Sequence, residues 1–266
     1  MLTALDDLDT AIGTMRNGAF DYLVKPVRKA SLLEDVRKAV NYRDILLENR
    51  RLAKENEEYQ RSLEKKVEER TGDLANAYKK LKTINIETVK ILAETIEAKD
   101  PYTRGHCVRV RDISKKIAEE FGIGPDKIEL LQYGALLHDI GKIGISEALL
   151  FKTTELTTEE QESFRLHPVI GMNILKEVDF FTPIIPIIRY HHERYDGKGY
   201  PDGLSGESIP LLARIVTLAD AFDAMSSNRP YRKALAVNNT LTELKEGAGT
   251  QFDPKLIELF FEKEIF

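Results

Sequence analysis

Apolar and polar positions change their spacing twice along the chain, which divides it into three zones. In residues 1–30, a short stretch with helical spacing leads to Gly18 and then to the apolar segment FDYLV, a strand candidate. Lys25-Pro26 ends this strand, because proline donates no hydrogen bond to a sheet. The zone is typical of the last part of an α/β unit, which cannot bury a core alone.

Residues 31–85 contain no proline, one glycine and many Glu, Lys and Arg, which predicts a long helix. Apolar residues first recur every seven positions and then, after a phase slip, with a 4-3 spacing. The seam consists of Ile45, Leu52, Tyr59, Val67, Arg70, Leu74, Ala77, Leu81, Ile84, Thr88 and Ile91. It predicts a coiled coil and a parallel homodimer. Because polar residues such as Arg70 and Asn49 interrupt it, a single solvated helix is the alternative.

Residues 86–266 carry helical spacing almost throughout and no β-type alternation, which predicts an all-α domain. Thr157 and Glu160 form a capping box, and Gly122 and Gly124 end one helix before the next begins. The expected helices are 90–98, 108–121, 128–138, 159–166, 171–178, 184–193, 211–225 and 256–262.

Composition limits the class of protein. Of the 266 residues, 42% are hydrophobic, which supports a real core, and the net charge of −5 argues against a basic surface for nucleic acid. The single cysteine, Cys107, excludes an internal disulfide and fits a reducing compartment. No apolar run approaches the ~20 residues of a membrane helix, and the N-terminus is acidic where a signal peptide is basic. We expect a cytoplasmic protein without a nucleic-acid or membrane partner.

The chemistry of the chain is concentrated in its histidines and two aspartates. Each stands at or inside an apolar helical stretch: His106, His138, Asp139, His167, His191, His192 and Asp220. A bare carboxylate buried there costs several kcal/mol unless it is paired or bound to a metal. One histidine alone is more often an ordinary core or surface residue than a ligand, but every histidine of the chain shares this placement. We therefore predict a metal cluster.

The ligand set predicts two metal ions. Five imidazoles and two carboxylates exceed the needs of a single open catalytic ion, and Asp139 is the best candidate to bridge a pair. Nitrogen and oxygen ligands suit Fe, Mn, Zn, Ni or Co, whereas a structural thiolate zinc site is excluded for lack of cysteines. Two ions about 3.5–4 Å apart are a common arrangement for displacing a phosphate ester.

Positive residues near these segments favour a phosphate substrate. Lys142 follows His138 by four residues, one turn further on if the helix continues, where it would hold a phosphate oxygen. Arg229 and Arg232 follow the helix that carries Asp220, and guanidinium groups bind phosphate through paired hydrogen bonds. Surface charge is the alternative for these residues.

Several motifs resemble those of the HD-GYP family of metal phosphohydrolases. HDIGK at 138–142 is similar to the HD-x-G-K core of the HD superfamily, and HHERYDGKGYP at 191–201 resembles the HD-GYP signature. DPYTRGH, FRLHP, LADAFDAMSSNRPYRKA and GAGTQFDP also match in order, so the resemblance covers residues 86–266. It implies an all-α HD-type helical bundle that hydrolyses cyclic di-GMP, a bacterial second messenger, to pGpG, with further cleavage to GMP left open.

The resemblance also implies a role for each matching residue. One ion would take His106, His138, Asp139 and Asp220, and the second would take Asp139, His167, His191 and His192. The catalytic residues would be Asp139 and Lys142, and the substrate contacts would be Lys142, Arg229, Arg232 and Asp223. Asp223 has a second expected role, which is to support a ligand from behind. The implied metals are Fe or Mn, with Zn, Ni or Co as alternatives.

The rest of the signature has a structural interpretation. The Gly199-Tyr200-Pro201 loop would shape the rim of the site or contact partner proteins, and Glu193 and Asp196 would hold the loop in shape. Some family members place a Glu, which supports a third metal, four residues before the first His. Here that position is Tyr102, so we expect two metals.

Residues 1–30 resemble the end of a two-component receiver domain, with Thr3 at the switch threonine and Lys25-Pro26 at the Lys-Pro signature. The resemblance implies a response regulator that begins partway through its receiver, and an unrelated αβ extension is the alternative. The expected organisation is a receiver remnant at 1–30, a long coiled-coil helix at 31–85 and an HD-GYP domain at 86–266.

Three functions stay open at this point. The leading hypothesis is a binuclear-metal phosphodiesterase acting on cyclic di-GMP. The second is a catalytically weak sensor that binds cyclic di-GMP or a partner, such as a diguanylate cyclase or a sensor kinase. The third is an HD hydrolase of another nucleotide, which the Gly-Tyr-Pro loop disfavours. The complete ligand set argues against the sensor, because a protein that only binds is free to lose ligands.

Overall fold

The computed structural model describes residues 2–3, 12–13, 15–98, 105–152, 154–227 and 236–266. The chain forms two compact units, Met1–Lys79 and Lys80–Phe266. No helix within the described ranges is both long enough and apolar enough to cross a membrane.

The first unit begins with two short parallel strands. β1 (Leu2–Thr3) pairs with β2 (Leu23–Val24), with Leu2 opposite Leu23 and Thr3 opposite Val24. β2 lies inside the segment FDYLV, so the predicted strand is confirmed, and parallel pairing is the arrangement of an α/β unit. The origin of this piece in a receiver domain stays a prediction.

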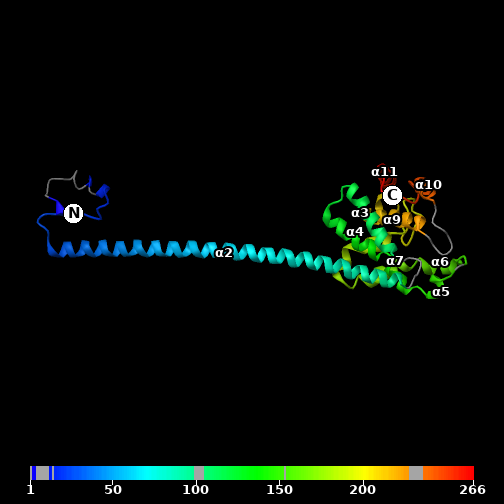
Figure 1. Cartoon of the computed structure of the whole chain (residues 1–266), viewed down its shortest axis with the longest axis horizontal. Coiled ribbons are helices and arrows are strands. Elements are labelled where there is room, and N and C mark those ends of the chain that lie inside the picture. The colour runs from blue at the N-terminus through cyan, green and yellow to red at the C-terminus, as the bar shows by residue number, and fades with distance from the viewer. Residues whose placement is uncertain (1, 4–11, 14, 99–104, 153, 228–235) are drawn as a thin grey trace. The chain divides into compact units, whose positions relative to one another are not determined.

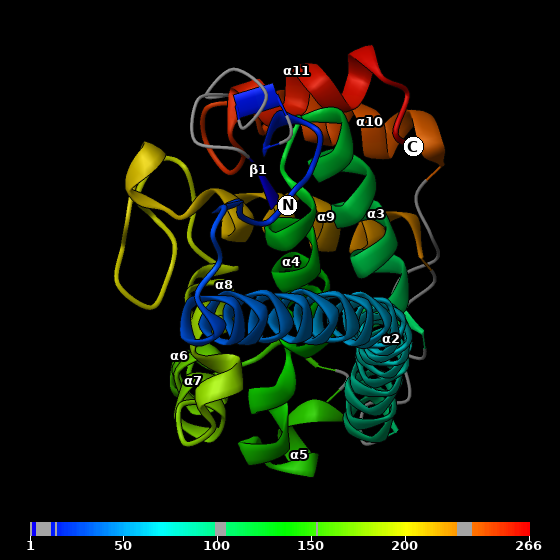
Figure 2. The ribbon, with the colours of Figure 1, turned by 90° about the vertical axis from the view of Figure 1, so that its left-hand side faces the viewer.

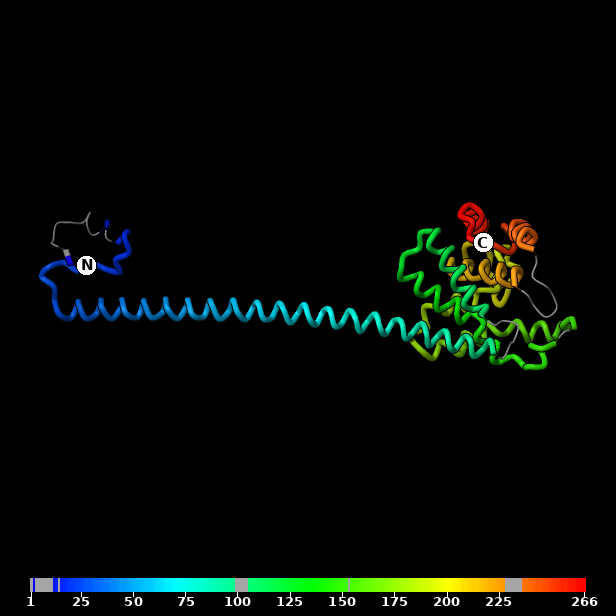
Figure 3. The backbone as a smooth tube through the Cα atoms, viewed as in Figure 1, coloured from blue at the N-terminus to red at the C-terminus, as the bar shows by residue number. Residues whose placement is uncertain are grey.

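The long helix α2 runs from Lys29 to Glu97 without a break and so continues past the boundary expected at residue 85 (Figures 1 and 3). It contains no proline, and ion pairs one turn apart, such as that of Arg51 with Glu55, lie along its surface. These local features favour a helix of this length even where little of it is buried.

The predicted apolar seam of α2 is open to solvent in the first unit. Ile45, Leu52 and Tyr59 are 60%, 47% and 68% exposed, and Leu74 is 71% exposed. A row of large apolar side chains is costly to leave in water, so the seam is suited to a partner helix. The coiled coil itself stays a prediction.

The second unit is a helical bundle, as predicted. After α2 its elements are α3 (His106–Glu120), α4 (Pro125–Leu137), η1 (Ile140–Gly144), α5 (Glu147–Leu150), α6 (Thr158–Phe164), α7 (His167–Leu175), η2 (Asp179–Ile184), α8 (Ile185–Tyr190), η3 (Gly206–Ser208), α9 (Leu211–Ser226), α10 (Val237–Glu246) and α11 (Pro254–Glu262). The predicted capping box of Thr157 and Glu160 is present at the start of α6. The all-α fold class is confirmed.

α3, α4 and α9 form the centre of this bundle, and α11 packs against α3 and α9 (Figure 2). α9 is apolar on almost every side, and its Ile215, Val216 and Leu218 are completely buried. A helix of this kind is stable only inside a core. It therefore carries Asp220 into the middle of the domain.

Two elements differ from the expected helices. The apolar pattern misses α10, because its sequence is mostly polar and only Thr240 and Leu244 are buried. α7 begins at His167 rather than at Gly171, since Pro168 is well placed in the first turn of a helix.

Candidate metal centre

The predicted ligands converge from five segments of the second unit. They stand at the start of α3, between α4 and η1, at the start of α7, directly after α8, and within α9. In two groups, every residue offers a ligand atom within 4.8 Å of the others: Asp139, His167, His191 and His192, and His106, His138 and Asp139. Asp220 lies beside the second group, with its Oδ1 3.3 Å from Nε2 of His106. Asp139 belongs to both groups, which is the placement that a bridging carboxylate needs.

Hydrogen bonds to the backbone fix three of the imidazoles. In His138, His167 and His191, the Nδ1–H donates to the carbonyl oxygen three residues earlier, at 2.8, 2.9 and 2.8 Å. A carbonyl only accepts, so the ring proton sits on Nδ1 and Nε2 keeps its lone pair. Histidines that bind metals are commonly oriented in this way.

The Nε2 atoms of the cluster lack partners that would satisfy them. Those of His167 and His191 lie 3.3 Å apart, and with Nδ1 protonated neither has a hydrogen to donate. Nε2 of His138 is buried and has no hydrogen-bond partner among the described residues. Lone pairs this close repel, and an unsatisfied buried nitrogen is costly, unless a cation lies among them. The cluster therefore fits divalent metal ions.

Lys142 contacts Asp139 directly. The chain turns into η1 after Asp139, so Lys142 does not lie one α-helical turn beyond His138; its Nζ is 2.6 Å from Oδ2 of Asp139. Burial opposes ionisation of Asp139, but the Lys142 ammonium and the His138 imidazole outweigh burial and hold the pKa of the carboxyl well below its usual range. Asp139 is therefore ionised, which is the form that binds metals.

A buried carboxylate holds His106 from behind. The Nδ1–H of His106 donates to Asp223 at 2.7 Å, and Nε of Arg109 donates to the same carboxylate at 2.5 Å. Asp223 is 3% exposed, so its contacts favour support of a ligand over contact with substrate. Burial lowers the pKa of His106, but the hydrogen bonds to Asp220 and Asp223 outweigh burial and raise it to about 9.

The Gly-Tyr-Pro loop lies against His192. The Tyr200 ring stacks on the His192 ring with centroids 4.9 Å apart and an angle of 27° between the planes, and the Arg165 guanidinium lies 5.4 Å from the Tyr200 centroid. Burial and the neighbouring His167 imidazole lower the pKa of His192 to about 3. The His192 ring is thus held in place and neutral.

Glu193 shapes this loop, as expected. Its Oε1 accepts hydrogen bonds from the backbone N–H groups of Asp202 at 2.7 Å and Gly203 at 3.0 Å. A Cβ added at Gly199 would lie 2.3 Å from the backbone nitrogen of Arg194, so no larger residue fits there without a backbone shift. These contacts support a structural role for the loop at the rim of the centre.

Three predicted positions, Tyr102, Arg229 and Arg232, lie outside the described residues. The motifs do not single out Glu97, a buried carboxylate at the end of α2 that accepts hydrogen bonds from the backbone at the start of α3. A signal for it exists, because Glu97 continues the four-residue spacing of buried Val89 and Ala93.

Comparison with known proteins identifies the family. The HD domain family model matches residues 90–256. The chain belongs to the HD domain family. The matched range begins inside α2 and takes in every residue of the candidate metal centre, which in this HD domain protein starts at His106 and ends at Asp220.

The HD domain protein has relatives that match along most of its length. It is 35% identical over 269 residues to "Cyclic di-GMP phosphodiesterase response regulator RpfG" of Xanthomonas campestris pv. campestris (strain 8004), covering 97% of this chain and 65% of the relative. It is 35% identical over 271 residues to "Cyclic di-GMP phosphodiesterase" of Thermotoga maritima, covering 100% of this chain and 71% of the relative. The chain thus spans about two thirds of these relatives' own length. They confirm the resemblance to HD-GYP phosphodiesterases.

A solved structure shows the same fold. The cyclic GMP-AMP specific phosphodiesterase V-cGAP3 of V. cholerae superposes with a TM-score of 0.54 and 22% identity, over 67% of this chain and 48% of that one. At this identity the likeness concerns the fold alone.

Proposed function

We propose that the chain is a metal-dependent phosphodiesterase that hydrolyses cyclic di-GMP to pGpG. The observation that carries this proposal is the pair of ligand groups that share Asp139. Two adjacent cation sites with a common carboxylate suit the in-line displacement of a phosphate ester. The substrate class is supported by relatives named cyclic di-GMP phosphodiesterase, which match along 97% and 100% of the chain.

Each ion has a defined set of ligands in this proposal. One is held by His106, His138, Asp139 and Asp220, and the other by Asp139, His167, His191 and His192. Fe or Mn is the proposed metal, with Zn, Ni or Co as alternatives, because imidazole and carboxylate ligands accept each of them. When bound, the ions supply Lewis-acid activation of the phosphoryl group.

Lys142 is the proposed catalytic partner of Asp139. Its ammonium group lies at the edge of the cluster, 2.6 Å from Asp139, and its side chain is 15% exposed. A phosphate that approaches the ions therefore meets a fixed positive charge, which stabilises negative charge on the phosphoryl oxygens as the bond to the leaving group breaks. Arg229 and Arg232 are proposed as further contacts to the substrate.

Turnover by reconstituted protein tests the function. Cyclic di-GMP is incubated with protein loaded with Fe or Mn, the products are separated by chromatography, and the bound metal is counted. We expect pGpG from the wild type and none from Asp139→Ala. Glu207→Ala is the matched control, because Glu207 is an exposed acid paired with Lys255 and lies outside the candidate metal centre. Cleavage by Asp139→Ala at the wild-type rate contradicts the role of Asp139.

The same experiment separates the two rival functions. A sensor would bind cyclic di-GMP with metals present and release no pGpG. A hydrolase of another nucleotide would cleave 3'3'-cGAMP or a further cyclic dinucleotide faster than cyclic di-GMP. Whether GMP follows pGpG is read from the same chromatograms.

A parallel homodimer through residues 31–85 is part of the proposal. Most seam residues are large, apolar and exposed along α2, and their heptad-like spacing suits packing against a second identical helix in register. In this arrangement α2 pairs two catalytic domains and passes a signal from the N-terminal side. A diguanylate cyclase or a sensor kinase is the proposed further partner. A cytoplasmic location is also proposed, and the single cysteine, Cys107, supports it because a chain without an internal disulfide fits a reducing compartment.

A further inference from the structure

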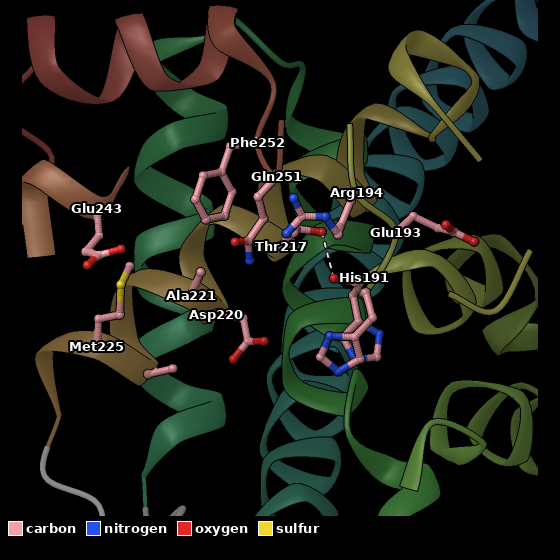
Figure 4. A pocket seen from close by; sticks show the side chains of 12 residues that line it. His191, Glu193, Arg194, Thr217, Asp220, Ala221, Met225, Glu243, Gln251 and Phe252 are labelled. Atoms are coloured by element: carbon pink, nitrogen blue, oxygen red, sulfur yellow. Dashed lines mark hydrogen bonds between the residues drawn. The ribbon is translucent and has the colours of Figure 1, made fainter. Parts of the chain in front are cut away.

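A cavity of about 530 Å³ opens beside the candidate metal centre. His191, His192 and Asp220 are among the residues that line it, so the cavity and the candidate metal centre share a wall. Figure 4 shows His191 and Asp220 in this wall. Its volume lies within the range of small-molecule sites, about 300–1,000 Å³. A molecule whose phosphate reaches the ligands therefore has room here for a neighbouring part of its structure.

The wall next to the metal centre is apolar. Ala221, Ala224 and Met225 follow Asp220 along one side of α9, and Phe252 closes the wall from the segment before α11. The two alanines are small, the Met225 thioether is flexible, and Phe252 offers an aromatic ring. Together they leave space for a flat group that packs its faces against apolar atoms. A nucleobase has this shape.

The far end of the cavity holds a carboxylate. Figure 4 shows Glu243 of α10 on the opposite side of Asp220 from the His191 ring. Within the described part of the chain, the Glu243 carboxylate makes no hydrogen bond or ion pair. The Arg194 guanidinium, which also lines the cavity, is already paired with Asp196 at 2.8 Å. Glu243 is therefore an acceptor available to a bound molecule.

We propose that this cavity binds one base of the dinucleotide and that the Glu243 carboxylate selects guanine over adenine. The inference rests on the proposed function. Guanine presents two adjacent donors, its ring N1–H and its exocyclic amino group, and a carboxylate accepts both at once. Adenine has a lone pair on N1 where guanine has the hydrogen, so the same carboxylate repels it. Paired, charge-assisted hydrogen bonds are strong and discriminate against an analogue that lacks the donors.

Replacement of Glu243 by glutamine tests the assignment. Glu243→Gln keeps the size of the side chain but removes its charge and one acceptor. We expect kcat/KM for cyclic di-GMP to fall by about 10- to 100-fold. Hydrolysis of cyclic di-AMP should not fall, and that of bis(p-nitrophenyl) phosphate, which has no base, should stay the same. Glu246→Gln is the matched control, because Glu246 lies on the same helix but outside the cavity lining.

Binding without turnover separates the pocket from the reaction. With metal-loaded protein and phosphorothioate analogues that resist hydrolysis, calorimetric titration should show that Glu243→Gln weakens binding of the cyclic di-GMP analogue by a similar factor and leaves binding of the cyclic di-AMP analogue unchanged. If Glu243→Gln keeps the wild-type preference between the two dinucleotides in both assays, the pocket assignment is wrong. The metal-loaded wild type could bind cyclic di-GMP more tightly than cyclic di-AMP, lose this preference in Glu243→Gln, and yet cleave neither dinucleotide. In that case the proposed function is wrong and the pocket assignment is supported.

Discussion

The carboxylate of Glu97 accepts a hydrogen bond of 2.6 Å from the backbone N–H of Cys107. Its other oxygen accepts one of 2.7 Å from Gly105, so the two bonds hold the residues on either side of His106. Glu97 is the last residue of α2 and is 6% exposed. It therefore joins the end of the long helix to the backbone that positions one ligand of the metal centre.

We expect Glu97→Gln to lower the affinity of the site that includes His106 for its metal ion. The amide keeps one acceptor and turns its NH₂ group toward the second backbone N–H, which loses its partner. Outer contacts of this kind are typically worth 10- to 100-fold in metal affinity. Metal titration measures the effect, and Glu94→Gln, one turn earlier at an exposed position paired with Lys90, is the control. Equal affinities in both variants would contradict a positioning role for Glu97.

Asp139→Asn should lower the metal content of the protein more than a change at a residue that only supports a ligand, such as Glu97 or Asp223. Asp139 belongs to both ligand groups, so its loss affects both ions, and the amide carries no negative charge to offset theirs. The Lys142 ammonium, now 2.6 Å from a neutral oxygen, adds repulsion toward the cations. Elemental analysis should give less than half of the wild-type metal. Full occupancy of two ions per chain would rule out a bridging role.

The stability of the metal-free protein should fall as the pH rises from 6.5 toward 9. The pKa of His106 is raised from 6.5 to about 9, so its protonated form stabilises the fold fully below pH 6.5, and this contribution is lost as the pH passes the raised value. The shift corresponds to about 3 kcal/mol. Urea denaturation in chelator at several pH values measures it. In Asp223→Asn, which removes one of the carboxylates that raise the pKa of His106, the fall should be smaller.

Gly141→Ala should destabilise the domain and displace His167. A Cβ at Gly141 would lie 1.8 Å from the carbonyl oxygen of His167 and 2.6 Å from the backbone nitrogen of Gly171, so α7 must move. We expect a cost of about 3 kcal/mol or more, measured by thermal denaturation. Gly72→Ala is the control: a Cβ there meets nothing within 4 Å, and alanine favours a helix by about 1 kcal/mol.

The double variant Leu52→Asn, Leu74→Asn should be monomeric where the wild type is dimeric. Both residues lie on the seam, and two apolar side chains per helix would lose their burial, which raises the dissociation constant by at least about 100-fold. Leu47→Asn replaces an exposed leucine off the seam and should leave the dimer intact. Light scattering over a range of concentrations gives the mass. A monomeric wild type would leave α2 as a solvated single helix.

The pattern of apolar residues along the chain was sufficient to predict much of the fold. The spacing of apolar residues predicts α3, α4, α8, α9 and α11 close to their observed ends, because each buries one face or, for α9, nearly all of its surface. It does not predict α10, whose polar sequence becomes helical through the packing of Thr240 and Leu244. Where tertiary packing stabilises a helix, its own periodicity carries little information.

For the candidate site, the sequence predicted the set of residues, because all five histidines and two aspartates sit in apolar segments where a common cation would offset the cost of their burial. Tertiary structure decided how they are held. Asp223 lies behind His106, Lys142 contacts Asp139 across a turn of η1, and Tyr200 stacks on His192. The physical reason is that residue types fix the available chemistry, whereas contacts between segments far apart in the chain depend on the packing of whole helices.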